Sequence, residues 1–594
     1  MAEKIISPGV FTNEVDQSFL PAGVAAIGAA IIGPTAKGPA GIPTTVTSYS
    51  EFVQKFGGVL TSGSGASEGS YKYLTNYAAQ EYLKYADTLT VVRVLAGAYG
   101  PASSFVTQSI GAGYSFKLTT LADGAVLNSG RDIASTTLGK GSPLDEGANN
   151  ILLSGSANNI RWEVSTVNTA KGTFTLTLRR GDDTSRRKTI LEQFNNLTLD
   201  PNSPGFITRV IGDQVYTVRD SGAADPFLQL SGSFPNKSSY VRVEAVKSTL
   251  NYLDSNGNIR VGAASASLPA AVSGTFAVGS DGSVQHPQSF FETISNTNTQ
   301  GYNLANGNTG LDAYIDAIRL LKNQDEYDIN LLVLPGLVDN FPNHAEVISE
   351  ALGMAEDRGD CFLVYDPVEY GAALSTAATA AGTRDSNYAA VYWPWVKIPD
   401  ADLGKNVWVP ASTLIPGVYA FNDRVAAPWF APAGLNRGGI DIAIQTERKL
   451  TLANRDSLYD ASVNPIATFP NSGVVVFGQK TLQKKSSALD RVNVRRLLIA
   501  AKKFIASSTK YLVFENNTAA TRNRFLSIVN PYFDNIQQRQ GLYAFKVVMD
   551  ETTNTPDVID RNEMRGQIFL QPAKTAEFII VDFNVLPTGA SFPE

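Results

Sequence analysis

The chain has 594 residues and a formal net charge of −6; hydrophobic residues make up 43% of it and charged residues 18%. This length predicts several domains, the composition excludes a disordered chain, and the small charge argues against wholesale nucleic-acid binding. A single cysteine, Cys361, excludes a disulfide scaffold. The apolar stretch at 22–33 is too short to span a bilayer, and the start lacks a signal-peptide pattern, so we expect folding in a cytoplasm.

The first residues, MAEKIISPGVFTNEVDQS, predict an extended segment after a Pro-Gly turn. Its apolar residues are Val10, Phe11 and Val15, and they alternate with polar residues too closely for a core helix. Chain ends usually fray unless something holds them. Two interpretations are open on these residues alone: an edge strand on the protein's own sheet, or an arm that pairs with another molecule.

The pattern up to about residue 98 alternates strands and helices. Residues 24–33 and 89–96 predict buried strands, and residues 71–86 a helix. A short helix is expected between them, with Ser48 or Ser50 as its N-cap and Gly57 just past its end. The Gly/Ser-rich stretch at 58–70 predicts a loop.

From about 99 to 300 the helical period disappears and short alternating runs predict strands, at 160–167, 172–181 and 239–246. Asn256-Gly257 is a two-residue hairpin signal. The surrounding DSNGN lacks the glycine and distal glutamate of a calcium loop, so a bare turn is favoured. One helix is expected at 184–197.

The alternation of helices and strands then resumes. Residues 309–323 and 343–359 predict helices, and residues 328–336 and 361–367 predict buried strands. Strand, helix and strand at this spacing indicate a βαβ unit with parallel strands. The simplest architecture is one discontinuous α/β core, interrupted by a β-rich insertion.

Catalytic and metal-binding patterns are not found in the sequence. The two histidines, His286 and His344, are far apart; His286 falls in a polar loop and His344 is most simply a surface residue. Cys361 is expected in the core. Asp366 follows a parallel strand, where active-site carboxylates often lie, but an aspartate before a proline is more often a turn residue. We therefore expect that the protein is not an enzyme and that it binds no cofactor and no metal.

The aromatic-rich middle and the C-terminal part carry a resemblance. Four motifs follow one another in order: YWPWVK (392–397), VPAS (409–412), PGVYAFND (416–423) and APWFAPAG (427–434). Taken alone, this stretch predicts a strand, a loop and a Pro/Gly-rich connection. With GQKTL (478–482), VNVRRL (492–497) and VFENN (513–517), it resembles the contractile tail sheath proteins of bacteriophages. Departures include Pro416 in place of the usual alanine and Lys480 in place of an arginine.

The resemblance covers about 1–98 and 300–594 and implies a structural role. Many copies would stack helically around a tail tube and contract to drive the tube through the host envelope. The implied partners are other copies, the tail tube protein, and baseplate and tail terminator proteins, without direct nucleic-acid contact or membrane insertion. The location would be the virion tail, assembled in the host cytoplasm. Part of the family is described as subtilisin-like, which is a fold comparison and does not imply proteolysis.

Two other functions are open alternatives to a phage tail sheath. A sheath from a non-phage contractile injection system would share the mechanism, although the length and the insertion favour a phage. A secreted hydrolase or adhesin belongs to another class, and the missing signal peptide and the scarcity of histidine argue against it.

The expected domains are an N-terminal arm (1–23), the α/β core (24–98 with 300–470), an outward β-rich insertion, possibly of two subdomains (99–299), a C-terminal α+β domain facing the tube (471–577), and a C-terminal strand and arm (578–594).

Two sets of site residues follow. In the family both chain ends reach into the C-terminal domains of neighbours, which favours strand exchange by Val10, Phe11 and Val15 at one end and by Phe578, Ile580, Val581, Phe583 and Val585 at the other. Residues 471–530 carry an excess of basic side chains, and on the helix predicted there a basic face lies opposite an apolar one. An ordinary solvated face would explain it, but the family favours contact with an acidic tube surface. The residues expected there are Arg491, Arg495, Arg496, Lys502 and Lys503.

Overall fold

The structure is a computed structural model, and it describes residues 28–62, 69–109, 113–130, 152, 154–250, 252–253, 258–260, 268–284, 290–470 and 472–577. The predictions for both terminal arms, for His286 and for the Asn256-Gly257 turn fall outside these residues. Within them, no helix is long and apolar enough to cross a membrane.

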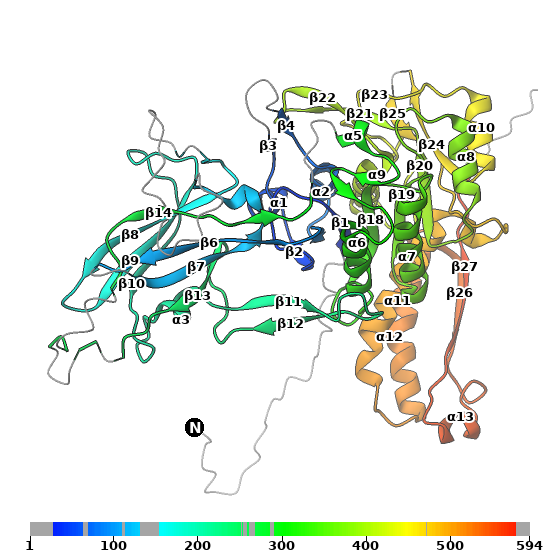
Figure 1. Cartoon of the computed structure of the whole chain (residues 1–594). Coiled ribbons are helices and arrows are strands. Elements are labelled where there is room, and N and C mark those ends of the chain that lie inside the picture. Colours follow the sequence, from blue (N-terminus) through cyan, green and yellow to red (C-terminus); the bar gives the residue numbers. More distant parts are fainter. Residues whose placement is uncertain are drawn as a thin grey trace, which may run out of the picture.

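An eight-stranded sheet forms the centre of the molecule (Figure 1). Its six middle strands run parallel, which confirms the βαβ prediction, and the two outer strands are antiparallel. In spatial order the strands are β2 (Thr44–Val46), β5 (Leu89–Arg93), β1 (Gly28–Gly33), β18 (Ile329–Val338), β19 (Phe362–Asp366), β20 (Ala389–Trp393), β24 (Val463–Phe469) and β25 (Gly473–Val476).

Helices cover both faces of this sheet and enclose two apolar cores. Because side chains alternate along a strand, Ala30 and Ile32 of β1 enter one core while Ala29 and Ile31 enter the other. The first core is closed by α6 (Thr309–Leu320), α7 (Pro342–Arg358), α8 (Leu374–Gly382) and α10 (Leu452–Asp460). The second is closed by α1 (Tyr49–Phe56), α2 (Leu74–Leu83) and α9 (Ala411–Val425).

Two local predictions in this part have clear outcomes. Ser48 caps α1 by accepting a hydrogen bond from Glu51 N, and Gly57 ends the helix at a φ of 80°, as expected. The Pro/Gly-rich connection expected around Pro416 is wrong, because α9 continues through it. A Cβ on Gly417 would lie 2.9 Å from Glu81 O, so the glycine lets α9 approach α2 closely.

Between residues 99 and 284, the residues that the structure describes form a β-rich block with its own apolar core. One sheet consists of β13 (Val241–Val246), β7 (Tyr114–Asp123), β6 (Tyr99–Thr107) and β15 (Ser280–Asp281), and another of β10 (Ile190–Leu197), β9 (Thr173–Arg180), β8 (Ile160–Asn168) and β14 (Ser273–Thr275). The helix expected at 184–197 is wrong: β10 pairs antiparallel with β9, and Phe194 and Leu197 pack on the core of the block.

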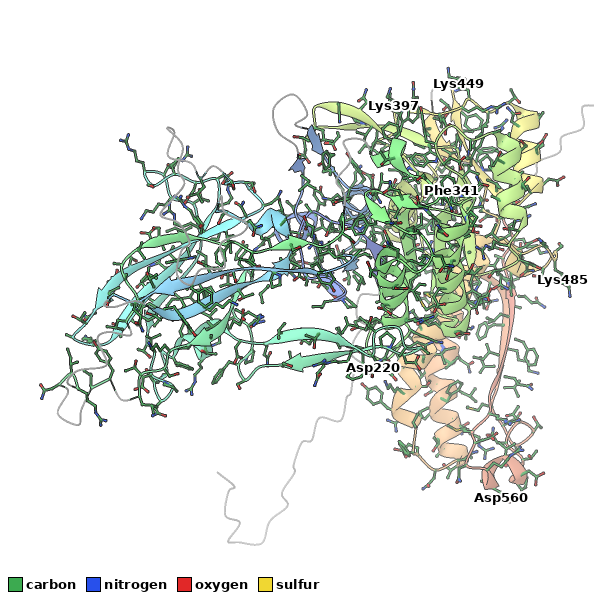
Figure 2. All side chains as sticks on the ribbon, viewed as in Figure 1. Asp220, Phe341, Lys397, Lys449, Lys485 and Asp560 are labelled. Carbon is green, nitrogen blue, oxygen red and sulfur yellow. The ribbon has the colours of Figure 1, made fainter. Side chains whose placement is uncertain are left out.

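The block touches the core at its root, at one hairpin, and through hydrogen bonds of Asn158 and Tyr240 with residues around α1. β11 (Val215–Arg219) and β12 (Phe227–Ser231) form that hairpin, and its turn at Asp220 reaches back to α6, where Gly222 N donates to Asp316 at 2.9 Å (Figure 2). At the root, Arg93 of β5 donates to the carbonyls of Gly38 and Asp123. The block also includes α3 (Ile207–Ile211) and the 3-10 turn Ala125–Leu127.

The C-terminal part consists of two antiparallel helices and a long hairpin (Figure 1). Its elements are α11 (Val492–Thr509), α12 (Ala519–Gln538), β26 (Leu542–Val548), α13 (Pro556–Asp560) and β27 (Gln567–Pro572), with the short 3-10 turns Ala488–Asp490 and Lys510–Leu512. The remaining short elements are β3 (Leu60–Ser62), β4 (Gly69–Tyr71), α5 (Phe290–Thr293), β16 (Asn298–Thr299), β17 (Tyr302–Asn303), β21 (Val396–Asp400), β22 (Lys405–Val409) and β23 (Gln445–Thr446).

Candidate functional site

The polar groups that sequence reasoning weighed for catalysis are engaged in structural contacts. His344 is fully buried, so its expected surface position is wrong. Its Nδ1 accepts a hydrogen bond from Val338 N at 3.2 Å, and its Nε2 lies 2.9 Å from Ser295 O. Burial lowers the pKa of His344 to about 4. Cys361 is buried at the edge of β19, as expected.

Asp366 binds the start of α9. Its carboxylate accepts hydrogen bonds from Ser412 N at 2.9 Å and from Ser412 Oγ at 2.5 Å, and burial raises its pKa to about 7. The aspartate therefore caps a helix, a role that suits a carboxylate at a helix N-terminus. Among the residues that the structure describes, no group of three or more histidine, cysteine, aspartate or glutamate side chains could hold a metal ion.

The exposed basic face expected on α11 is wrong. Arg495, Arg496 and Lys503 are buried, and their charges are directed at the α/β core of the same chain. Arg496 pairs with Asp423 of α9 at 2.5 Å, and the Arg495 guanidinium lies 3.7 Å from the centre of the Tyr388 ring. The physical reason is that α11 packs between the core and α12, so that both faces of the helix are covered.

The remaining residues of that set also contact their own chain. Lys503 pairs with Asp360 at 3.0 Å and with Asp328. Lys502 is exposed and reaches Gly359 O at 3.4 Å. These contacts fasten α11 to the core along the stretch from Arg495 to Lys503.

The long hairpin β26–β27 is a two-stranded sheet that stands beside α12 (Figure 1). The register pairs Phe545 with Leu570 and Val547 with Ile568, and these four side chains pack on the small core formed with α11 and α12. An isolated two-stranded sheet is marginal in water, so the hairpin depends on this packing.

The other face of the hairpin is exposed among the residues that the structure describes. Tyr543 is 63% exposed and Phe569 is 55% exposed on the outward face. Within the described part of the chain no third strand pairs with either edge; the Gln537 side chain donates to Tyr543 O at 2.9 Å. Unpaired strand edges can accept an added strand through main-chain hydrogen bonds, so this hairpin is the candidate functional site.

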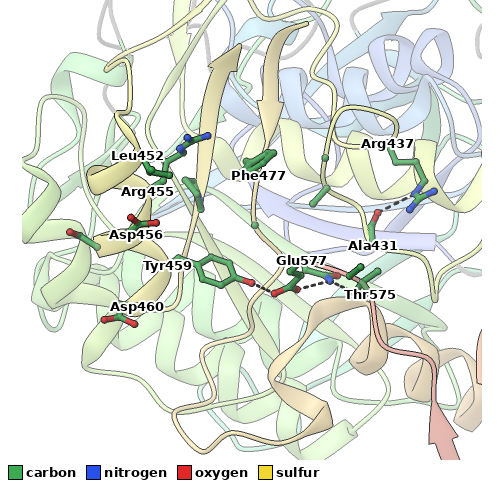
Figure 3. Close-up of a pocket in the computed structure, with 17 residues that line it drawn as sticks. Ala431, Arg437, Leu452, Arg455, Asp456, Tyr459, Asp460, Phe477, Thr575 and Glu577 are labelled. Atoms are coloured by element: carbon green, nitrogen blue, oxygen red, sulfur yellow. Dashed lines mark hydrogen bonds between the residues drawn. The ribbon is translucent and has the colours of Figure 1, made fainter. Parts of the chain in front are cut away.

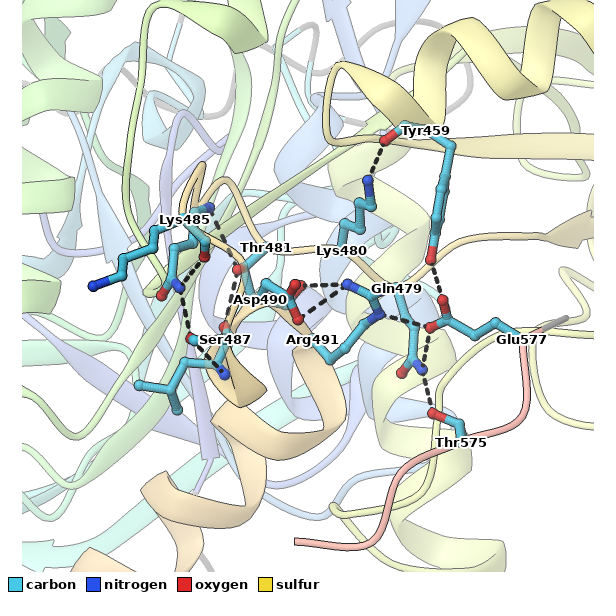
Figure 4. A network of polar contacts seen from close by, with 12 residues as sticks. Tyr459, Gln479, Lys480, Thr481, Lys485, Ser487, Asp490, Arg491, Thr575 and Glu577 are labelled. Atoms are coloured by element: carbon cyan, nitrogen blue, oxygen red, sulfur yellow. Dashed lines mark hydrogen bonds and ion pairs between the residues drawn. The ribbon is translucent and has the colours of Figure 1, made fainter.

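After β27 the chain is clamped to the core at Glu577 (Figure 4). Arg491 Nε donates to Glu577 Oε1 at 2.8 Å and the Tyr459 hydroxyl to Oε2 at 2.5 Å, while Gln479 Nε2 reaches both Glu577 Oε1 at 3.0 Å and Thr575 Oγ1 at 2.7 Å. Burial acts to raise the pKa of Glu577, but the hydrogen bonds from Tyr459, Arg491 and Gln479 outweigh it and hold the pKa below its usual value.

A groove of about 760 Å³ lies beside this clamp (Figure 3). Residues 575–577 form part of its wall, and α10, the loop after α9 (residues 431–437), Pro465 of β24 and the segment after β25 form the rest. Leu452 is 67% exposed and Phe477 is 44% exposed there. The guanidinium of Arg455 lies 5.3 Å from the centre of the Phe477 ring.

Comparison with known proteins identifies the class. Residues 306–482 match the phage tail sheath protein central domain, and residues 484–586 match the phage tail sheath C-terminal domain. The central and C-terminal parts of the chain therefore match the two domains of phage tail sheath proteins. The resemblance found in the sequence is confirmed.

Two curated relatives and one solved structure illustrate the likeness. The tail sheath protein of Vibrio phage KVP40 is 44% identical over 190 residues, 32% of this chain and 28% of that protein. The tail sheath protein of Enterobacteria phage T4 is 32% identical over 298 residues, 47% of this chain and 45% of that protein. The matched stretches thus span less than half of these relatives. A sheath tail protein from Listeria innocua shares the fold, with a TM-score of 0.51 and 12% identity over 93% of this chain and 96% of that one.

Sequence reasoning missed the residues that make the clamp and the strand β26. Tyr459, Gln479 and Glu577 come from segments up to 118 residues apart, and no local pattern joins them. The alternation in LYAFKVV at 542–548 is a strand signal and was available in the sequence.

Proposed function

We propose that this chain is a subunit of a contractile phage tail sheath, which polymerises helically around the tail tube and contracts to drive the tube through the host envelope. Neighbouring subunits are linked by exchange of their terminal arms, which add strands to the open edges of β26–β27. The observation that carries this proposal is the hairpin itself: two strands with exposed aromatic side chains, whose outer edges pair with no other strand of the described residues.

Main-chain hydrogen bonds alone do not stabilise an added arm strand, so apolar side chains must contribute as well. An added strand of about six residues forms about six hydrogen bonds worth ~0.5–1.5 kcal/mol each, while ordering costs ~1–2 kcal/mol per residue. Burial of apolar side chains at ~1.5–3 kcal/mol each then decides the balance. The arms supply such side chains: Val10, Phe11 and Val15 at the start, and Phe578, Ile580, Val581, Phe583 and Val585 at the end.

The remaining architecture follows from this assembly. The arms are 1–23 and 578–594, residues 24–98 with 300–470 form the core, and 471–577 form the inner domain. The β-rich block at 99–299 projects away from the core (Figure 1) and is proposed to face outward. The partners would be other copies, the tube protein, and baseplate and terminator proteins, with assembly in the host cytoplasm and function in the virion tail. A heterologous contact that does not close into a ring generates such a helix.

Removal of residues 1–18 tests arm exchange. The truncated chain is expected to stay folded and soluble, with an unchanged melting temperature, but to form no continuous tubes in electron micrographs of the purified protein. A matched pair sharpens the test: aspartate at Val10, Phe11 and Val15 should block assembly, whereas aspartate at Thr12 and Asn13 should not. A truncated subunit that is destabilised, or that still forms tubes, would favour an arm paired to its own body.

We also propose that the chain is not an enzyme. Support comes from the buried, doubly hydrogen-bonded ring of His344 and from the structural role of Asp366. Purified tubes should hydrolyse no general peptidase substrate, and His286→Ala should assemble like the parent. Any peptidase activity that His286→Ala or His344→Gln removes would overturn this assignment.

A further inference from the structure

We propose that the apolar groove beside Glu577 seats the residues that directly follow it in the same chain, so that the C-terminal arm has a root held on its own subunit and a distal part free to reach a neighbour. This inference deepens the proposed function and depends on it for the role of the distal part. The clamp and the groove themselves are features of the single chain.

The first argument is the position of the clamp. Glu577 and Thr575 are held by side chains from three separate segments: Tyr459 of α10, Gln479 after β25 and Arg491 before α11. Charge-assisted hydrogen bonds such as the Arg491 contact are stronger than neutral ones. The clamp therefore fixes where the arm leaves and in which direction it starts.

The second argument is the groove. Residues 575–577 already form part of its wall, so the next residues begin at its rim. Its volume of about 760 Å³ falls within the ~300–1,000 Å³ typical of binding pockets. Leu452 and Phe477 expose apolar surface into it, and Arg455, which stacks on the rings of Phe469 and Phe477, lines its wall. Contiguous exposed apolar surface in a protein of this kind marks a contact site.

The third argument is the match with the sequence that follows. The next four residues are Phe578, Ile579, Ile580 and Val581, all apolar and suited to strand geometry. An extended chain covers ~3.3 Å per residue, so these four span about 13 Å and stay near the groove. The 13 residues from 582 to 594 could still reach about 40 Å. Of the arm residues proposed above for exchange, Phe583 and Val585 would then reach the neighbour, whereas Phe578, Ile580 and Val581 would stay in the groove of their own subunit.

A cross-linking experiment tests the occupant directly. The doubly substituted chain Leu452→Cys, Ile580→Cys is treated with a short bis-maleimide, as free subunit and as tubes. The native Cys361 is fully buried and its pKa is raised to about 12 by burial, so it should not react. We expect an intramolecular link in both forms, seen as a mobility shift at monomer mass. The pair Leu250→Cys, Ile580→Cys is the control, since Leu250 is similarly exposed but lies in the β-rich block, and it should give no link.

The position and yield of the cross-link show which segment occupies the groove. A ladder of covalent oligomers in tubes would show that a neighbour's tail fills the groove, and absence of any link would show that the tail does not occupy it; either result overturns the inference. Addition of Glu577→Gln to the linking pair should lower the yield of the intramolecular link, whereas Glu563→Gln, whose half-exposed carboxylate pairs with Arg565 in the segment between β26 and β27, should not. Because the link is read in the free subunit, loss of tube formation with the link intact would count against arm exchange alone.

Discussion

At the scale of single residues, Asp366 at the end of β19 binds the start of α9, and the protonation state of its carboxyl depends on pH. Its carboxyl is buried, and its pKa in the folded chain is about 7, compared with a reference value of 3.8. A raised carboxyl pKa stabilises the folded chain fully below the unfolded pKa, and this contribution is lost as the pH rises to the folded pKa. The window for Asp366 is therefore about pH 4 to 7.

We expect the stability difference between the parent and Asp366→Asn to shrink as the pH rises. The shift corresponds to up to about 4 kcal/mol across the window, at ~1.4 kcal/mol per pKa unit. Thermal unfolding at pH 5 and pH 8 measures it, with the asparagine variant closer to the parent at pH 8. A difference that stays constant, or that grows with pH, would mean that Asp366 is ionised throughout.

At the scale of elements, the hairpin β26–β27 is the surface most sensitive to outward-facing changes. Phe569→Glu places a charge on the open face without touching the packed one, so we expect an unchanged melting temperature and a loss of tube formation. Phe227→Glu is the matched control, because Phe227 is 52% exposed on β12 of another two-stranded sheet, compared with 55% for Phe569. Electron microscopy shows whether each variant forms tubes. Equal tube formation by both variants would mean that the hairpin does not take part in the contact between subunits.

Helix α11 should respond to charge reversal through its own fold. Lys503→Glu faces Asp328 and Asp360 with a third carboxylate, and breaking a buried ion pair costs about 3–5 kcal/mol, so the chain should unfold at lower denaturant concentration. Lys502→Glu changes an exposed side chain and should cost less than about 1 kcal/mol. Urea unfolding of the two variants checks this order. Equal effects would imply that the Lys503 pairs contribute nothing to stability.

At the scale of the whole molecule, the chain enters and leaves the β-rich block at one root, and the block touches the core elsewhere only through side-chain and turn contacts among the described residues. The strands that enter and leave it pair with each other, since Tyr99 opposes Asp281, and Ser283 N donates to Ala96 O at 2.9 Å. The chain on either side of the block therefore lies close together and can be joined by a short turn. The block also has its own apolar core.

We expect two pieces to fold separately as a result. A chain with Gly97 joined to Ser283 by a two-residue turn should keep a cooperative thermal transition and still form tubes, with some loss of stability because Arg93 loses its contact with Asp123 O. Residues 99–282 alone should also unfold cooperatively. Circular dichroism and electron microscopy check both. If the chain that lacks the block folds but forms no tubes, the block takes part in the contacts between sheath subunits.

The secondary structure of the core could be predicted because it depends on local patterns. Continuous apolar runs indicated β1, β18 and β19, helical spacing indicated α6 and α7, and Ser48 and Gly57 marked the ends of α1. Two errors have tertiary causes. The stretch at 184–197 has a helical period, but β10 pairs along β9 and covers the core of the block. Pro416 and Gly417 look like a loop, but close packing of α9 on α2 stabilises a helix there.

The sequence by itself determined the resemblance to tail sheath proteins, through motifs spread over the central and C-terminal parts, and the type of most core elements, through hydrophobic periodicity. Only the tertiary structure decided which charges are satisfied within the chain and which edges are open. A basic helix has the same pattern whether its charges face solvent or Asp423 and Asp360, because the partners lie 73 and 143 residues away from Arg496 and Lys503. The same holds for Glu577, whose three partners meet only after the sheet, α10 and α11 have packed.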